Sequence, residues 1–190
     1  CDGQASGAGR DGEGGGAFLP GNCILQRSCL YDNIARRGGG AAVFGASIVR
    51  QCLFQDNELY TEGWAGEGAG VFLGDGACLE NCLVRNNGLE NQGAYRGGGG
   101  VAVTGAGKVD FCTIVGNCGI GAGSGVRYSG TGGLLSNSVI WGNLGSSCQL
   151  YSNETQLQNN AIESGVEIPG CIALCAVNCG ESGPEGNDNR

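Results

Sequence analysis

Cysteine is the residue type in this chain with the greatest capacity for covalent chemistry. The 190 residues include twelve cysteines and no histidine. An even number at this density is typical of chains that fold in an oxidising compartment, and it predicts a disulfide-rich protein. The disulfide candidates are Cys1, Cys23, Cys29, Cys52, Cys78, Cys82, Cys112, Cys118, Cys148, Cys171, Cys175 and Cys179.

The spacing of the cysteines does not favour a metal site. Structural zinc sites use paired C-x-x-C elements, often with histidine, and the sequence contains neither. Glycine-aspartate pairs such as Asp75-Gly76 are turn signals first, although calcium binding remains an alternative for them. We therefore expect no metal and no cofactor.

Asparagine recurs at intervals of 24 to 30 residues and closes a repeated unit. The closing residues are Asn33, Asn57, Asn87, Asn117 and Asn143. Each unit opens with a glycine block, as in Gly38-Gly39-Gly40 and Gly98-Gly99-Gly100. A period of this size indicates one supersecondary unit per repeat, which is stabilised by stacking on its neighbours.

The residues between the glycine block and the asparagine predict strands. Helical repeats tolerate few glycines, and the chain contains 41. The apolar runs are short and are bounded by turn residues, as in Val71-Phe72-Leu73, which is typical of β-strands. The step from Val109 to Cys112 breaks the alternation, so we expect a bend there. Each unit then supplies about three short strands and forms one coil of a solenoid.

Stacked coils place equivalent residues one strand spacing apart, roughly 4.8 Å. The closing asparagines should therefore form a ladder that satisfies the backbone groups of one bend, which is a structural role. Cys52, Cys82 and Cys112 share another column. Their expected spacing falls within the range of Cα separations that a disulfide allows, so two of the three could pair.

The sequence resembles the right-handed parallel β-helix repeat family, whose fold is shared by pectate-lyase-like enzymes and many secreted and surface proteins. The residues that carry the resemblance are 68–73 (GAGVFL), 81–87 (NCLVRNN) and 137–143 (NSVIWGN). The similarity covers roughly residues 14 to 147. It implies an all-β, right-handed parallel β-helix of about five to six coils, and this fold hosts enzymes, adhesins and passive stalks alike.

The resemblance also implies an enzymatic alternative, a lyase or glycosidase acting on acidic polysaccharide. Lyases of similar fold combine calcium-binding carboxylates with a Lys or Arg base. The candidate residues are Asp56, Asp75, Asp110, Arg50, Arg85 and Lys108. Arg50 and Arg85 fall in different columns of the repeat, Asp110 has no acidic partner in its column, and no carboxylate cluster emerges. We therefore expect that the protein is not an enzyme.

Two coils carry longer excursions, at residues 58–67 and 88–96. Insertions at the same point of neighbouring coils emerge on one face, where solenoids usually place binding elements. Tyr60, Trp64 and Tyr95 could form a stacking platform for a sugar or a contact for another subunit. The alternative is that these aromatic side chains pack on one another.

The repeat divides the chain into three parts. Residues 1–13 form an N-terminal cap or docking tail, residues 14–147 the β-helix repeats, and residues 148–190 a last coil with a Cys-rich C-terminal cap or tail. Cys1 is expected in a disulfide, with the lipidated cysteine of a bacterial lipoprotein as the alternative. Asn153 begins an N-glycosylation sequon.

Charge and hydropathy exclude two classes of partner. A net charge of −8 with a single lysine argues against nucleic acid, and no apolar run is long enough to span a bilayer. An open β-helix exposes unpaired backbone groups at both ends. We therefore expect an extracellular or cell-surface structural protein, a homo-oligomer or filament subunit that stacks end to end. A glycan-binding adhesin that uses the two excursions is the alternative.

Overall fold

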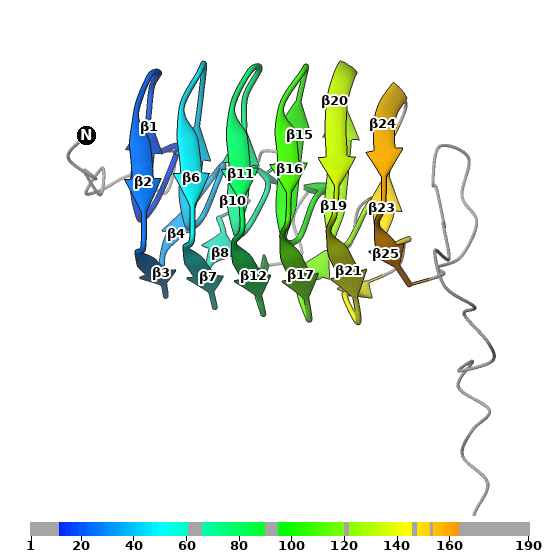
Figure 1. The fold of residues 1–190 in the computed structure, drawn as a ribbon. Helices are drawn as coiled ribbons and strands as arrows, with labels where there is room; N and C mark the ends of the chain where they lie inside the picture. The colour runs from blue at the N-terminus through cyan, green and yellow to red at the C-terminus, as the bar shows by residue number, and fades with distance from the viewer. Residues whose placement is uncertain are drawn as a thin grey trace, which may run out of the picture.

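The computed structural model is an all-β parallel solenoid of about five turns, which confirms the architecture predicted from the repeat. Successive coils lie side by side along one axis, with β1 to β3 at one end and β23 to β25 at the other (Figure 1). The structure describes residues 12–60, 66–89, 95–119, 122–145, 148–152 and 154–163. No described residue belongs to a helix that is long and apolar enough to cross a membrane.

Three six-stranded sheets form the walls of the solenoid, and each coil gives one strand to each sheet. Sheet 1 contains β1 (Ala17–Leu19), β5 (Ala41–Val43), β10 (Val71–Leu73), β15 (Val101–Thr104), β19 (Val126–Ser129) and β23 (Leu150–Tyr151). Sheet 2 contains β2 (Ile24–Gln26), β6 (Ile48–Arg50), β11 (Cys78–Glu80), β16 (Lys108–Asp110), β20 (Thr131–Ser136) and β24 (Glu154–Gln158). Sheet 3 contains β3 (Cys29–Tyr31), β7 (Leu53–Gln55), β12 (Leu83–Arg85), β17 (Thr113–Val115), β21 (Val139–Trp141) and β25 (Ala161–Ile162).

Shorter strands complete each coil between sheet 3 and the next glycine block. A three-stranded sheet joins β4 (Ile34–Ala35), β8 (Glu58–Leu59) and β13 (Gly88–Leu89). Two-stranded sheets join β9 (Gly66–Glu67) to β14 (Tyr95–Gly97), and β18 (Cys118–Gly119) to β22 (Leu144–Gly145).

Pairing between coils is parallel and almost entirely in register. Val84, for example, lies between Phe54 of the preceding coil and Ile114 of the following coil. Residues at the same position of the repeat therefore lie over one another, as predicted. Columns of Leu, Val, Ile and Phe side chains point inward and form one continuous core.

A left-handed residue turns the chain from sheet 2 into sheet 3 in every coil. These residues have φ between 49° and 56° and are Arg27, Gln51, Asn81, Phe111, Asn137 and Asn159. One residue with φ in this range reverses the side-chain alternation and produces a sharp corner. The bend predicted between Val109 and Cys112 is confirmed, because Phe111 is that residue. We call this edge of the solenoid the αL corner.

The glycine blocks make room for the neighbouring coil and for the asparagines. The first glycine of each block, such as Gly68 with φ of 67°, adopts a conformation that disfavours side chains. The third glycine lies against the closing asparagine of its own coil. A Cβ at Gly70 would lie 2.6 Å from the Gly100 carbonyl oxygen and 3.0 Å from Nδ2 of Asn87. The two markers of the repeat are therefore parts of one packing arrangement.

Candidate functional site

The closing asparagines form a continuous hydrogen-bonded ladder along one edge of the solenoid. The side chain of Asn57 donates to Oδ1 of Asn87 at 2.9 Å, and Asn87 donates to Oδ1 of Asn117 at 2.8 Å. The backbone N–H of each asparagine donates to the same oxygen at 3.0 Å. The ladder thus satisfies buried backbone groups at the bend and fixes the stacking of the coils.

The two ends of this ladder differ. At the C-terminal end, Oε1 of Gln149 accepts from both the backbone N–H and Nδ2 of Asn143, at 3.1 and 2.7 Å. Nε2 of Gln149 also donates to the Asn143 carbonyl at 2.9 Å. At the N-terminal end, Oδ1 of Asn33 accepts no hydrogen bond from any described residue. Within the described chain, the C-terminal end of the ladder is closed and the N-terminal end has a free acceptor.

The outermost strands present unpaired backbone groups. Among the described residues, β1, β2 and β3 pair with the second coil alone, and β23, β24 and β25 pair with the preceding coil alone. The Cys23 carbonyl accepts from the Ile48 N–H at 2.8 Å. This carbonyl and the Ile24 N–H belong to the same peptide unit. Because the C=O and N–H of a trans peptide point in opposite directions, the Ile24 N–H points away from the solenoid.

The apolar side chains of the end coils are only in part buried: Leu25 in the first coil and Leu157 in the last are partly exposed. Leu19 in the first coil is 2% exposed, and Ile162 in the last coil is 1% exposed. The two rims, formed by β1, β2 and β3 at one end and by β23, β24 and β25 at the other, therefore offer main-chain donors and acceptors with a small apolar surface. Any contact made through them would depend mainly on β-pairing.

The described cysteines divide into two groups. Cys23 and Cys148 each take part in a disulfide bond. Free thiols are present at Cys29, Cys52, Cys78, Cys82, Cys112 and Cys118. The oxidised state expected from the sequence is therefore not formed at these six positions. Cys1, Cys171, Cys175 and Cys179 lie outside the described residues.

The column of Cys52, Cys82 and Cys112 shows why stacking alone does not produce a disulfide. In-register residues of parallel strands hold their Cα–Cβ bonds parallel, so the Cβ atoms stay about 4.8 Å apart, beyond the usual disulfide range. Each thiol instead donates to the carbonyl two residues earlier, at 3.2 to 3.3 Å. Hydrogen bonding with Cys112 and burial raise the pKa of Cys82 to about 12. This thiol stays protonated at neutral pH and is a poor nucleophile.

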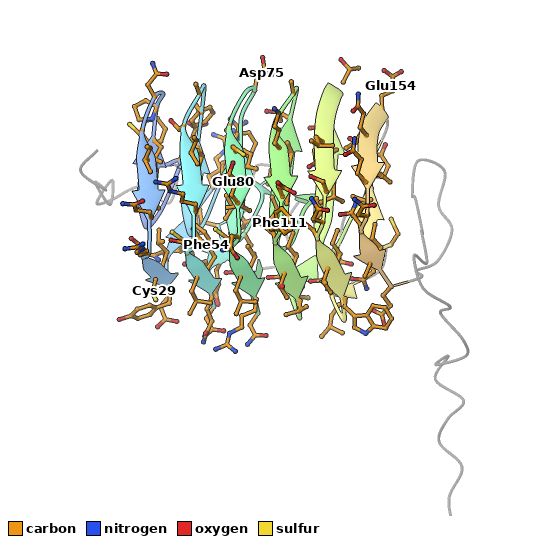
Figure 2. The ribbon with its side chains drawn as sticks, viewed as in Figure 1. Cys29, Phe54, Asp75, Glu80, Phe111 and Glu154 are labelled. Carbon is orange, nitrogen blue, oxygen red and sulfur yellow. The ribbon has the colours of Figure 1, made fainter. Side chains whose placement is uncertain are left out.

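The charged residues considered for lyase chemistry do not converge. Asp56 lies at the bend before the ladder, and Asp75 lies in the turn between sheets 1 and 2, where it accepts from the Ala106 N–H at 2.8 Å. Figure 2 shows Asp75 at the outer turn, well separated from Phe111. Arg50 and Arg85 bond to Gln26 and Gln55 respectively, and Lys108 begins β16. Among the described residues, no group of His, Cys, Asp and Glu is placed to hold a metal ion.

The prediction that Asp110 lacks an acidic partner in its column is wrong. The register places Glu80 directly beside Asp110, and Arg50 on the other side of Glu80. The signal is present in the sequence, since Glu80 is seven residues before Asn87 just as Asp110 is seven before Asn117. The outer edge of sheet 2 thus carries a row of charged and amide side chains.

Two further contacts were not predicted. Glu67 and Arg127 form a largely buried ion pair of 2.7 Å that spans two coils. Gly97 lies between them, and a Cβ there would lie 2.8 Å from Cδ of Arg127. On the outer face of sheet 1, the ring of Phe44 stacks between those of Phe18 and Phe72, with ring centroids 5.6 Å apart in each pair. The ion pair skips one coil, and Phe44 stacks from outside the column that Phe18 and Phe72 share, so no local sequence motif indicates either contact.

The two excursions begin and end side by side, because β8 pairs with β13 at their starts and β9 pairs with β14 at their ends. Tyr60 lies at the start of the first excursion and is half-buried. Trp64, the side chain of Tyr95 and Asn153 lie outside the described part of the chain. The aromatic platform and the glycosylation site therefore stay predictions.

Comparison with known proteins does not place the chain in a family. No protein-family model, no curated protein and no solved structure matches it. The resemblance to the β-helix repeat family is supported as far as the parallel solenoid architecture itself.

Proposed function

We propose that the protein is a non-enzymatic, extracellular structural subunit that assembles end to end by stacking its β-solenoid. The observation that carries the proposal is the set of edge strands at each end. The described parts of β1, β2 and β3 pair on one side, and so do those of β23, β24 and β25. The two rims belong to the same three parallel sheets, so one rim can continue the sheets of the other.

Two features of this proposal go beyond the architecture. We infer a right-handed coil, because parallel strands joined by crossovers in one sheet are right-handed in about 98% of cases. We also infer an oxidising location, supported by the even number of twelve cysteines and by the bonded state of Cys23 and Cys148.

Joining would depend on backbone hydrogen bonds more than on apolar burial. Leu19 and Ile162 in the end coils are already buried, and the partly exposed Leu25 and Leu157 leave a small apolar surface to cover. The free Oδ1 of Asn33 adds one acceptor at the N-terminal rim. At the other end, Gln149 of the last coil closes the ladder at Asn143, one coil inside the rim formed by β23, β24 and β25.

The test is assembly of the purified full chain with one edge donor removed. Ile24→Pro deletes an outward N–H that bonds to no described residue, and proline is tolerated at such edge positions. Ile24→Ala is the matched control, because it shortens the side chain and keeps the N–H. We expect linear particles by electron microscopy for the wild type and for Ile24→Ala, and monomers for Ile24→Pro.

Unfolding curves accompany the imaging and show whether Ile24→Pro keeps the fold. A wild-type chain that stays monomeric at high protein concentration would overturn the proposal. Equal assembly of the proline and alanine variants would show that the β2 edge is not the joint.

A further inference from the structure

The αL corner carries one residue that does not suit it. At five of its six positions the left-handed residue is polar, and three of these are asparagine, which tolerates this conformation. The sixth is Phe111, with φ of 51° and a side chain that is 63% exposed. A bulky side chain is disfavoured at positive φ, and an exposed ring gains nothing from the core.

The ring of Phe111 therefore stabilises neither the bend nor the core. A strained residue that persists without a structural benefit points to a contact outside the fold. Figure 2 shows Phe111 and Glu80 on neighbouring coils of the same lateral face, away from both ends of the solenoid. This face stays accessible when copies stack end to end.

Two adjoining hollows run along this face. One, of about 390 Å³, is lined by Gln26, Arg27, Arg50, Gln51, Glu80 and Asn81. The other, of about 420 Å³, is lined by Glu80, Asn81, Asp110 and Phe111. Because they share Glu80 and Asn81, they form one groove across four coils, roughly 14 Å at the strand spacing.

The polar groups of the groove are held in place. Oδ1 of Asp110 accepts from Ser136 at 2.7 Å and from Asn137 at 2.8 Å. Arg50 donates two bonds to Oε1 of Gln26. Oδ2 of Asp110 accepts no hydrogen bond from the described residues, so a fixed acceptor lies beside the ring of Phe111.

We propose that this groove binds a neutral glycan chain. The ring of Phe111 offers an apolar face for the C–H face of a sugar. The carboxylates of Glu80 and Asp110 accept hydroxyl protons, and the amides of Gln51 and Asn81 donate and accept. Arg27 and Arg50 balance the charges of Glu80 and Asp110 within the groove, so its lining favours a neutral chain, and the net charge of −8 of the whole chain disfavours acidic polysaccharides. The proposal is independent of end-to-end assembly.

The decisive variant is Phe111→Asn in the full chain. Asparagine is the residue found at three equivalent corners, so the bend should be kept or stabilised while the ring is removed. The probes are neutral hexasaccharides of β-1,4-linked glucose, mannose, xylose and N-acetylglucosamine, measured by isothermal titration calorimetry. We expect saturable binding of at least one probe, weakened about tenfold or more by Phe111→Asn with no loss of thermal stability.

Tyr31→Asn is the control, since Tyr31 is an exposed aromatic residue on the outer face of sheet 3. It should leave binding unchanged. The proposal is overturned if no neutral probe binds, if Phe111→Asn binds as well as the wild type, or if polygalacturonate binds as tightly as the neutral chains. Capture of a lysine-rich peptide alone, lost in Phe111→Asn, would assign the groove to a basic protein segment instead.

Discussion

Asn87 is fully buried and links three coils through one side chain. Its Oδ1 accepts from the backbone and the side chain of Asn57. The two protons of its Nδ2 are shared among three acceptors, Oδ1 of Asn117 and the carbonyls of Phe54 and Arg85. Asparagine is suited to this position because its amide donates and accepts along one axis. Aspartate cannot donate, and glutamine is longer by one methylene group.

Asn87→Ala should lower the free energy of unfolding by about 3 kcal/mol, because it leaves two donors of Asn57 buried without an acceptor. Asn33→Ala is the matched control. Its Oδ1 accepts nothing from the described chain and its side chain is less buried, so the expected loss is about 1 kcal/mol. Urea denaturation of the two variants measures the difference. Equal losses would show that the ladder does not stabilise the interior coils more than the end.

At the scale of the coil, much of the fold could be predicted because every element is repeated in register. The strands, the bend at Phe111 and the stacking of the asparagines all follow from positions counted back from each closing asparagine. Gln149 could not be found this way, since it completes the ladder from a loop six residues after Asn143. The Glu67–Arg127 pair joins side chains of coils that are not adjacent, and no local pattern encodes it.

The groove at the αL corner could not be predicted from the sequence, for a different reason. Its residues are ordinary surface types in sequence, and Phe111 reads as one more apolar residue in a strand. Its exposure depends on the left-handed bend, which turns this one side chain outward. The bend could be predicted from the sequence, but the outward direction of the Phe111 ring is seen only in the structure.

The glycine blocks allow neighbouring coils to approach closely, and a substitution at Gly70 tests this packing. Gly70→Ala places a Cβ 2.6 Å from a backbone oxygen of the next coil and 2.7 Å from Cγ1 of Val84. Neither atom is at the end of a flexible side chain, so the coils must move apart. We expect a loss of about 2–3 kcal/mol in the free energy of unfolding.

Gly142→Asn is the control for this variant. Unlike Gly70, Gly142 has positive φ, at 61°, but a Cβ added there would meet no described atom within 4 Å, and asparagine tolerates the conformation. Its free energy of unfolding should stay within about 0.5 kcal/mol of the wild type. Comparable thermal shifts in the two glycine variants would contradict the close-packing explanation.

At the scale of the whole molecule, the solenoid is polar, because all the strands of one sheet run in the same direction and the two rims differ. A subunit blocked at one rim can still join a growing assembly through the other. Ile24→Pro removes a donor at the N-terminal rim and leaves β23, β24 and β25 unchanged. Such a chain should act as a terminator of end-to-end growth.

We therefore expect that about one Ile24→Pro chain added per ten wild-type chains limits the particles to roughly ten subunits, since each blocked chain ends one particle. Particle lengths measured by electron microscopy, or masses measured by light scattering, check this number. Ile24→Ala added in the same ratio should leave the length distribution unchanged, because it keeps the edge donor. If both variants shorten the particles equally, the side chain and not the backbone edge makes the joint. If neither does, growth does not pass through the N-terminal rim, and the solenoid joins its partners by another surface.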